Sequence, residues 1–247
     1  EICVVYNGEI YNFQALRQQL IAAGHHFRTA CDTEVLVHGY EQWGDSFVER
    51  LRGMFAFALW DDVKKRLLLV RDRFGVKPLY YVETNDGRLL FASEIKAFFV
   101  SPRVVREVND ERLAEYLIFR SIVGQETIFR GINEVEPGTF IEIRADGYYK
   151  AHRYWTPEVG DTEPQENLVD KGRELLVDAV KIRLVSDVAL GTITSGGVDS
   201  SLISVIAAEL TEGPIDTFCV GFDNPAYDER PFARLVATQI GSRHHEI

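Results

Sequence analysis

The sequence predicts two domains of different fold class, an α+β domain followed by an α/β domain. Before residue 156, groups of apolar, strand-like runs stand apart from helical patterns, which is typical of α+β proteins. From residue 168 onward, strands and helices alternate, which indicates a parallel sheet with helices on its faces. Residues 156–167 are polar and contain two prolines, so we expect a linker there.

The first domain begins with a predicted buried strand at residues 2–6. A short polar turn with Asn7 and Gly8 follows, and apolar spacing then predicts a helix from Phe13 to the glycine at position 24. An amide side chain and a glycine N–H in such a turn can point at one oxygen atom, as in an oxyanion hole, but an ordinary turn explains the same residues. Asp32 precedes a second helix and can serve simply as its N-cap.

Apolar runs in the middle of this domain predict an antiparallel meander. The run at 54–61 is apolar at nearly every position, so we expect it to be covered on both faces. An Asp-Gly pair further along predicts a hairpin. The elements expected here are a helix at 45–52, strands at 54–61, 66–71, 79–82 and 89–92, short helices at 93–99 and 109–119, and hairpin strands at 139–144 and 148–154.

Charged residues gather in the connection between two of these strands. They are Arg71, Asp72, Arg73 and Lys77, with Glu94 further on. Two interpretations stay open: a solvated face, or an ion-pair network that supports the layer beneath a site.

The second domain opens with an amphipathic helix predicted at 168–185. The alternating elements after it are a strand at 188–194, a helix at 201–210, a strand at 215–220, a helix at 230–240 and the start of a strand at His244.

A glycine turn at residues 195–201 joins the first of these strands to the following helix. Gly196 and Gly197 let the backbone approach an anion, and the helix N-terminus offers unpaired N–H groups. The turn lies at the carboxyl end of its strand, where such sheets bind ligands, so we expect a phosphate site. It is not a Walker A loop, since no Gly-Lys-Ser/Thr closes it. The alternative is a tight turn in which Ser200 or Asp199 caps the helix.

Composition excludes several classes of partner. The 247 residues are 46% hydrophobic and carry a formal net charge of −11 without a Lys/Arg tract, so we expect a globular protein that binds neither nucleic acid nor a membrane surface. No run approaches the length of a transmembrane helix. The cysteines Cys3, Cys31 and Cys219 form no metal-binding pattern, so we expect reduced thiols in a cytoplasmic protein without a structural metal, with Cys3 buried in its strand.

The turn with the pattern Ser-Gly-Gly-x-Asp-Ser resembles the pyrophosphate-binding loop of the N-type ATP pyrophosphatases. Five further blocks, in the same order, make nearly the whole chain similar to glutamine-dependent asparagine synthetases. The six blocks are residues 7–12, 32–35, 53–57, 71–81, 91–97 and 195–201.

This resemblance implies a glutaminase domain of the N-terminal-nucleophile (Ntn) hydrolase fold at 1–155, with antiparallel sheets between helical layers. A linker at 156–167 would lead to an ATP-pyrophosphatase (PP-loop) domain that starts at 168. The implied reaction is ATP-dependent: ammonia from glutamine attacks β-aspartyl-AMP and yields asparagine, AMP and pyrophosphate. The implied small molecules are glutamine, aspartate, ATP and Mg²⁺, and a homodimer is possible in this family.

The resemblance also assigns roles in the first domain. Asn7 and Gly8 would form the oxyanion hole, while Glu9 and Asp32 would hold the α-amino group of glutamine. These roles are chemically sensible, because two carboxylates suit an ammonium group and two N–H donors suit a developing oxyanion.

In the second domain the resemblance implies a nucleotide site, with Asp199 binding Mg²⁺. Thr194 departs from the family pattern, which has an apolar residue just before the serine. The implied ATP-binding residues are Ile193, Ser195, Gly196, Gly197, Asp199, Ser200 and Val220.

The nucleophile of the family, an N-terminal cysteine upstream of the Asn-Gly-Glu block, is not in this sequence. We therefore expect a fragment cut at both ends that is inactive as it stands. Two alternatives stay open. One is a related amidotransferase, or an enzyme that makes a β-lactam; the other is a catalytically dead regulatory module.

Overall fold

The computed structural model describes residues 1–158 and 167–247 of the chain. The chain divides into two compact units, Glu1–Val159 and Gly160–Ile247, and each is described by itself. Of the linker predicted at 156–167, residues 159–166 lie outside the described residues.

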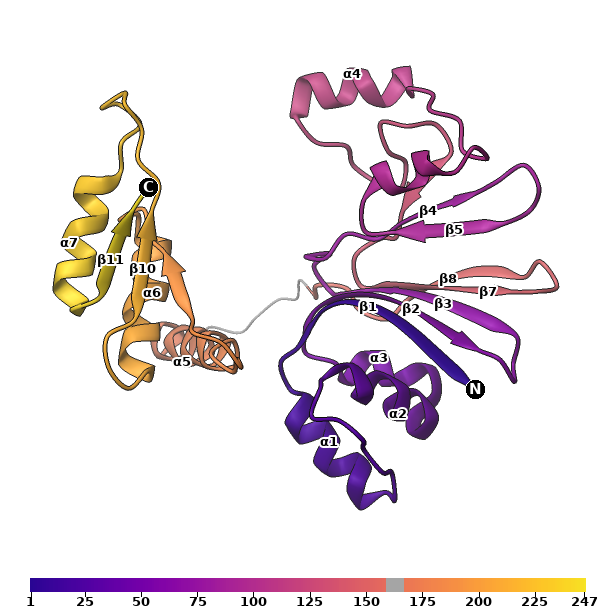
Figure 1. The fold of residues 1–247 in the computed structure, drawn as a ribbon, viewed down its shortest axis with the longest axis horizontal. Helices are drawn as coiled ribbons and strands as arrows, with labels where there is room; N and C mark the ends of the chain where they lie inside the picture. The colour runs from indigo at the N-terminus through magenta and orange to yellow at the C-terminus, as the bar shows by residue number, and fades with distance from the viewer. Residues whose placement is uncertain (159–166) are drawn as a thin grey trace. The chain divides into compact units, whose positions relative to one another are not determined.

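The first unit contains two antiparallel sheets stacked between helices, as Figure 1 shows. In spatial order the larger sheet consists of β1 (Ile2–Ile10), β2 (Gly53–Asp61), β3 (Arg66–Arg71), β7 (Thr139–Arg144) and β8 (Tyr149–Arg153). The smaller sheet consists of β5 (Leu89–Ala92), β4 (Tyr80–Glu83) and β6 (Ile132–Glu134). The helical elements are α1 (Phe13–Ala22), α2 (Thr33–Trp43), the 3₁₀ turn η1 (Gly44–Ser46), α3 (Phe47–Arg50), the 3₁₀ helix η2 (Ile95–Val100) and α4 (Asp110–Phe119).

Strand β2 is buried on both faces, which confirms the prediction from its apolar sequence. Phe55, Phe57 and Leu59 face the helices α1–α3 and form the main core with them. Ala56 and Ala58 face the smaller sheet. Strand β2 therefore presents large side chains to the helices and small ones to the other sheet.

Strand β1 is longer than predicted, because it continues through Asn7 and Gly8 to Ile10 and pairs with β2 throughout. A Cβ atom at Gly8 would lie 2.2 Å from a facing carbonyl oxygen of β2, and one at Gly53 would lie 2.1 Å from the carbonyl oxygen of Glu9. Glycines at both positions let the two strands approach closely. The Asn-Gly pair thus belongs to a strand, and the prediction of a turn was wrong.

The strands predicted between residues 54 and 92 do not form one meander. Strands β2 and β3 pair in the larger sheet, whereas β4 and β5 pair in the smaller one. The connection from β3 to β4 crosses between the sheets, and the hairpin of β7 and β8 forms as predicted.

Two buried charged side chains hold that connection in place. Asp72 is 1% exposed and accepts hydrogen bonds from four backbone N–H groups, at 3.0–3.1 Å. Arg71 donates to three backbone carbonyl oxygens and pairs with Glu134 at 2.8 Å. Arg71 and Asp72 are therefore neither a solvated face nor chiefly an ion-pair network, because they bind mainly backbone groups. Arg73 also donates to a backbone carbonyl oxygen, whereas Glu94 is exposed and paired with Lys96.

The second unit contains a parallel sheet in the order β11-β10-β9, which confirms the predicted alternation. Helix α6 begins three residues earlier than predicted, because the carbonyl oxygen of Gly197 already accepts a helical hydrogen bond from Ser201. The elements are α5 (Leu168–Lys181), β9 (Gly191–Ile193), α6 (Val198–Leu210), β10 (Asp216–Cys219), α7 (Arg230–Ile240) and β11 (Arg243–Glu246).

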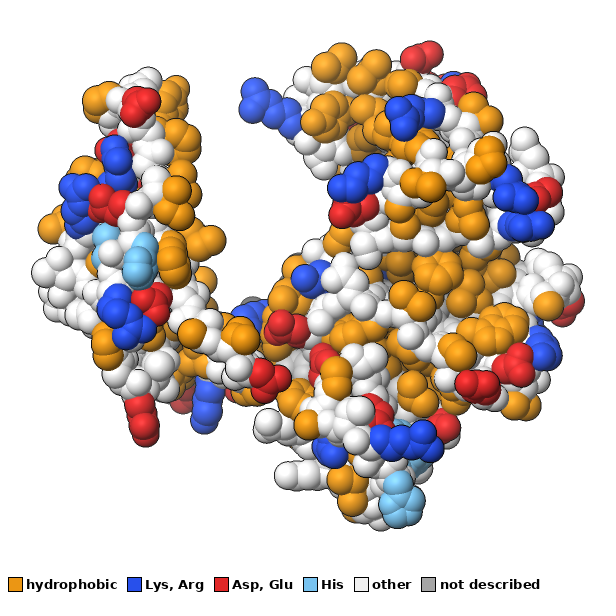
Figure 2. Space-filling model, in the orientation of Figure 1, with side chains coloured by type: hydrophobic (Ala, Val, Ile, Leu, Met, Phe, Trp, Pro, Cys, Tyr) orange, Lys and Arg blue, Asp and Glu red, His pale blue; other side chains and the backbone are white. Residues whose placement is uncertain are grey.

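Large hydrophobic side chains reach the surface of this unit, as the space-filling view in Figure 2 shows. Val198 is 82% exposed and Ile193 is 79% exposed. No helix among residues 1–158 and 167–247 is long and apolar enough to cross a membrane.

Candidate functional site

The open face of β1 carries Asn7 and Glu9. This strand is at the edge of the larger sheet, and its side chains alternate between a half-buried face, with Tyr6, and an exposed face. Cys3 lies on the exposed face together with Asn7 and Glu9, so the prediction that it is buried was wrong. The cause is the edge position of the strand, since only one of its faces packs against the helical core.

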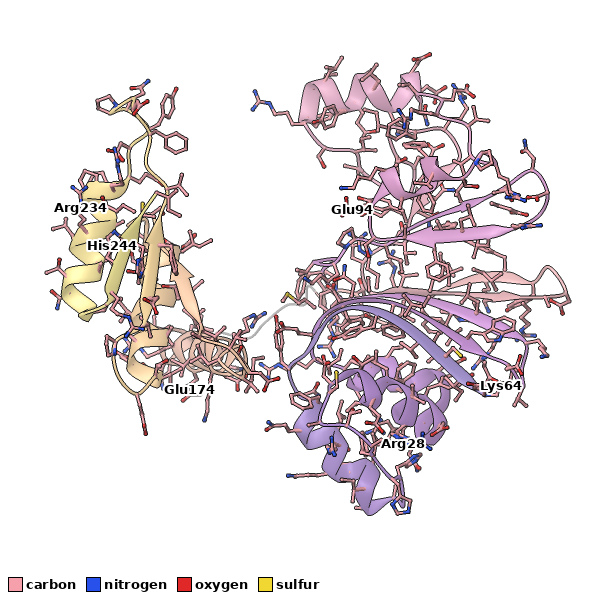
Figure 3. The ribbon with its side chains drawn as sticks, in the orientation of Figure 1. Arg28, Lys64, Glu94, Glu174, Arg234 and His244 are labelled. Atoms are coloured by element: carbon pink, nitrogen blue, oxygen red, sulfur yellow. The ribbon has the colours of Figure 1, made fainter. Side chains whose placement is uncertain are left out.

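Asn7 links the edges of the two sheets. Its side-chain Nδ2 donates a hydrogen bond of 3.1 Å to Oγ of Ser93, which directly follows β5. Glu94, labelled in Figure 3, is the next residue, and its side chain is exposed and paired with Lys96. The amide group of Asn7 is therefore held in a defined orientation at an open edge.

The N–H group of Gly8 points away from β2. In an antiparallel pair, N–H groups along a strand alternate between the partner strand and the opposite side. Tyr11 donates to the Arg52 carbonyl oxygen on the β2 side, at 2.8 Å, whereas Ile10 donates away from β2 to Asp32 at 2.9 Å. Gly8 lies two residues before Ile10, so its N–H has the same outward direction as that of Ile10.

Asp32 is anchored to the free edge of β1 rather than to its own helix. Its Oδ2 accepts hydrogen bonds from the Tyr6 hydroxyl, at 2.7 Å, and from the Ile10 N–H, and its side chain makes no capping bond to α2. Burial, followed by the hydrogen bond to Asp32, raises the pKa of Tyr6. Asp32 therefore contacts β1 on both sides of Gly8 along the strand, and Glu9 is the next residue of the strand.

The glycine turn of the second unit is packed against α7. Gly196 has φ +79°, and a Cβ atom there would lie 2.4 Å from Cβ of Phe232. Gly197 has φ −69° and is the N-cap residue of α6. Only the first of these glycines is thus required by the backbone and its surroundings.

Hydroxyl groups fix the shape of this turn from inside. Oγ of Ser200 lies 3.1 Å from Oγ of Ser195 and accepts a hydrogen bond of 3.2 Å from the Ser195 N–H. The Gly197 N–H donates to Oγ of Ser195 at 3.3 Å. The turn is therefore ordered by its own bonds, with the N-terminus of α6 at its end.

Acidic and apolar side chains surround the turn. Asp199 lies in the first turn of α6 and is exposed, so its charge sits beside the partial positive charge of the helix N-terminus. Ile193 ends β9 and Val220 follows β10, and both are exposed at the carboxyl ends of their strands. The structure thus brings the predicted nucleotide-site residues to one edge of the sheet.

Two buried hydroxyl groups lie at the two ends of this turn. Oγ1 of Thr194, in a residue that is fully buried, and Oγ of Ser201 have no hydrogen-bond partner among the described residues. Thr194 also bonds β10 through its N–H, which donates to the Phe218 carbonyl oxygen at 2.9 Å. Thr194, the polar residue that departs from the family pattern, is therefore buried directly before the turn.

A group that the sequence analysis missed lies on the helical side of the first unit. His25, His38 and Glu41 place one ligand atom each within 4.8 Å of one another. The spacing of His38 and Glu41, three residues apart on a helix, was a visible signal. The contribution of His25, from the preceding loop, was not visible in the sequence.

Comparison with known proteins agrees with this two-part organisation. Residues 1–155 match the family described as "Glutamine amidotransferase domain", and residues 171–247 match the family described as "Asparagine synthase".

Two curated relatives come from Bacillus subtilis. Asparagine synthetase [glutamine-hydrolyzing] 3 is 37% identical over 98% of this chain and 42% of its own length. Asparagine synthetase [glutamine-hydrolyzing] 1 is 37% identical over 96% of this chain and 37% of its own length. The chain thus spans about two fifths of the length of these relatives.

Among solved structures, glutamine phosphoribosylpyrophosphate amidotransferase from B. subtilis aligns over 99% of this chain and 60% of its own, with 18% identity and a TM-score of 0.46. The two family matches cover most of the chain in the order glutamine amidotransferase, then asparagine synthase. By these matches the chain belongs to the glutamine amidotransferase domain family over residues 1–155 and continues into a segment of the asparagine synthase family.

Proposed function

We propose that this chain is the part of a glutamine-dependent asparagine synthetase that contains the glutaminase domain, residues 1–155, and the first part of the synthetase domain, from residue 168. In the whole protein, ammonia released from glutamine attacks β-aspartyl-AMP and gives asparagine, AMP and pyrophosphate. One observation carries the proposal. The chain combines two N–H donors at an open strand edge with a glycine turn at a helix N-terminus in its other unit.

We assign the Ntn hydrolase fold to the first unit and the PP-loop fold to the second. Two antiparallel sheets between helical elements support the first assignment, and three parallel strands with the glycine turn after β9 support the second.

In the first domain, Asn7 and Gly8 would stabilise the oxyanion that forms when a thiolate attacks the amide carbon of glutamine. The Asn7 amide projects from the exposed face of β1 and has a second N–H besides the one bonded to Ser93, while the adjacent Gly8 N–H points out from the strand edge, which suits one oxygen atom. Collapse of the intermediate releases ammonia, and water then cleaves the thioester to give glutamate.

The attacking thiolate would be the N-terminal cysteine of the family, not a cysteine of this chain. Cys3 lies on the same face of β1 as Asn7, but four residues of extended strand separate them by about 13 Å. The Sγ of Cys31 contacts Oδ1 of Asp32 at 3.4 Å and therefore lies beside the carboxylate, not beside the donors.

Asp32 and Glu9 would bind the α-amino group of glutamine. Oδ2 of Asp32 is already engaged by Tyr6 and Ile10, which fixes the carboxylate, and Oδ1, which the Cys31 thiol contacts at 3.4 Å, keeps a further lone pair to accept from an ammonium group. Glu9 is exposed on the open face of β1 and adds a second negative charge near the same strand edge.

The turn at residues 195–201 fits a nucleoside triphosphate with Mg²⁺. Gly196 allows close approach of the backbone, and the hydroxyls of Ser195 and Ser200 and the N-terminus of α6 would bind phosphate oxygens. The exposed carboxylate of Asp199 would repel phosphates directly, so it suits a divalent cation between them. Bound ATP supplies the adenylyl group that activates the aspartate side chain.

Ile193 and Val220 would line the nucleotide site beside this turn. Both are exposed at the carboxyl ends of neighbouring parallel strands, where apolar side chains suit the base or ribose of a nucleotide.

The test measures asparagine formation by the full-length protein with ATP, Mg²⁺ and aspartate, using either glutamine or ammonium chloride as the nitrogen source. We expect product with both sources, and Asn7→Ala should remove the glutamine-dependent reaction while sparing the ammonia-dependent one. Absence of asparagine with both nitrogen sources would refute the proposal. Release of pyrophosphate with another carboxylic acid in place of aspartate would identify a related ligase.

A further inference from the structure

Three side chains of the first unit converge on one point between the α1–α2 loop and helix α2. Nδ1 of His25 lies 3.2 Å from Nδ1 of His38, and Oε2 of Glu41 lies 3.1 Å from the His38 nitrogen and 3.6 Å from the His25 nitrogen. His38 and Glu41 are three residues apart on α2 and share one side of it. His25 comes from the loop that begins after α1.

The size of this triangle matches a metal shell. Three ligands of a tetrahedral Zn²⁺ ion with bonds of about 2.0–2.1 Å lie about 3.3 Å from one another. The three observed separations, 3.1, 3.2 and 3.6 Å, are close to that value. A cation can therefore contact all three atoms without movement of the backbone.

The other ring nitrogens of both histidines face acceptors. Nε2 of His25 lies 3.0 Å from Oε1 of Gln42, and Nε2 of His38 lies 3.4 Å from Oε1 of Glu34. Each Nε2 is thus placed to carry the proton, which leaves each Nδ1 with a lone pair directed at the shared point. Metal-bound histidines show the same arrangement, in which the outer nitrogen donates to a carboxylate or carbonyl oxygen.

Glu34 is itself fixed in place. Its carboxylate accepts hydrogen bonds from the backbone N–H of Arg28 at 2.7 Å, and from the N–H and hydroxyl of Thr29 at 2.8 and 2.6 Å. Arg28, labelled in Figure 3, therefore marks the part of the α1–α2 loop that orients the outer carboxylate of the cluster. Through Glu34, the α1–α2 loop thus sets the orientation of the His38 ring.

With neutral imidazoles, hydrogen bonds satisfy this arrangement only in part. With both Nε2 atoms protonated, two nitrogen lone pairs and one carboxylate face one another and no proton lies between them. A proton on Nδ1 of His38 would satisfy only one of its two close contacts, since a single N–H points at one acceptor. A cation at the shared point satisfies all three groups at once.

We propose that His25, His38 and Glu41 bind a divalent transition-metal ion, and we commit to Zn²⁺. Two imidazoles and one carboxylate are ligands that Zn²⁺ prefers, and three protein ligands leave a fourth position for water. The side chain of Glu41 is 43% exposed, so the ion can enter from solvent. The ion would tie the α1–α2 loop to α2, close in sequence to Asp32.

The experiment titrates the metal-free protein with Zn²⁺ in competition with a coloured chelator. We expect the wild type to bind one Zn²⁺ ion per chain. In His38→Gln and in Glu41→Gln, the affinity for Zn²⁺ should be at least about tenfold weaker. His26→Gln is the matched control, because His26 is an exposed neighbour of His25 outside the cluster. Thermal unfolding without metal checks that each variant is folded, and Zn²⁺ should raise the melting temperature of the wild type and of His26→Gln only.

Co²⁺ spectra of the same proteins identify the ligand atoms. We expect the absorption of a tetrahedral nitrogen–oxygen site, absent in His38→Gln. Equal Zn²⁺ affinity in wild type and His38→Gln would overturn the proposal. A thiolate-to-cobalt band would also overturn it, because the ion would then be bound by Cys3 or Cys31, the exposed thiols of this unit.

Discussion

Replacing Gly196 with alanine should destabilise the second unit by about 2–5 kcal/mol. Gly196 has φ +79°, and an alanine in the left-handed region costs about 1–2 kcal/mol. The new Cβ atom would lie 2.4 Å from Cβ and 2.5 Å from the carbonyl carbon of Phe232, so α7 must move. Overpacking of this kind typically costs about 1–3 kcal/mol more.

The adjacent residue provides the matched control. Gly197 has φ −69°, which alanine adopts freely, and its nearest contact for a Cβ atom is Oγ of Ser195 at 3.4 Å. Gly197→Ala should therefore cost less than about 1 kcal/mol, the usual range for such a change at an N-cap. The two variants differ by one position and share the same chemistry.

Hydrogen exchange of the amides in α6 and β10 measures the effect where it occurs. The tryptophans Trp43, Trp60 and Trp155 all lie in the first unit, so their fluorescence should report an unchanged melt and serve as an internal control. The amide hydrogens of α6 and β10 should exchange much faster in Gly196→Ala than in Gly197→Ala. Equal exchange in the two variants would refute the prediction, because it would mean that α7 moves to accept the new Cβ atom with no loss of stability.

Three further predictions follow from single carboxylates. In the full-length protein, Asp32→Asn should raise the KM for glutamine about tenfold or more and spare ammonia-dependent synthesis, since it removes a charge-assisted contact of about 1.5–3 kcal/mol; an unchanged KM with a lower melting temperature would assign Asp32 a structural role. Asp199→Ala should abolish pyrophosphate release and spare glutamine hydrolysis; turnover within a few-fold of wild type contradicts this. Burial raises the pKa of Asp61, but hydrogen bonds from Tyr40 and two backbone N–H groups outweigh it, so the pKa lies below 3.8 when folded. The first unit should therefore lose stability as the pH falls below about 4, and Asp61→Asn should reduce that loss in unfolding measured against pH.

Elements with strong local signals were predictable from the sequence. Helix α7 has the predicted bounds, because Pro231 stands at its start and Gly241 at its end. Strand β2 is apolar at successive positions and is buried on both faces as expected. In each case the local pattern and the packing favour the same structure.

The remaining features depend on contacts between distant parts of the chain. Asn7-Gly8 favours a turn locally, but pairing with β2 outweighs that preference. Asp32 was predicted as a functional residue only through the resemblance, and its contacts with Tyr6 and Ile10 come from 26 and 22 residues away. The histidine cluster likewise needs His25 to meet α2 across a loop, which no periodicity reveals.

The connection between β3 and β4 illustrates how few positions need to be fixed for a loop to keep its path. Asp72 and Arg71 bind backbone groups, and every residue type except proline supplies a backbone N–H while all supply a carbonyl. Gly75 is constrained as well, because its φ is +64° and a Cβ atom would meet the Arg71 guanidinium at 2.9 Å. Val76, which is 58% exposed, is held through its backbone N–H group, whereas the ring of Phe74, a residue that is 74% exposed, also packs against the ring of Trp155, with centroids 4.9 Å apart. The side chain of Val76 can therefore change without loss of the backbone contact, so this loop can acquire a new surface while the chain beneath it keeps its course.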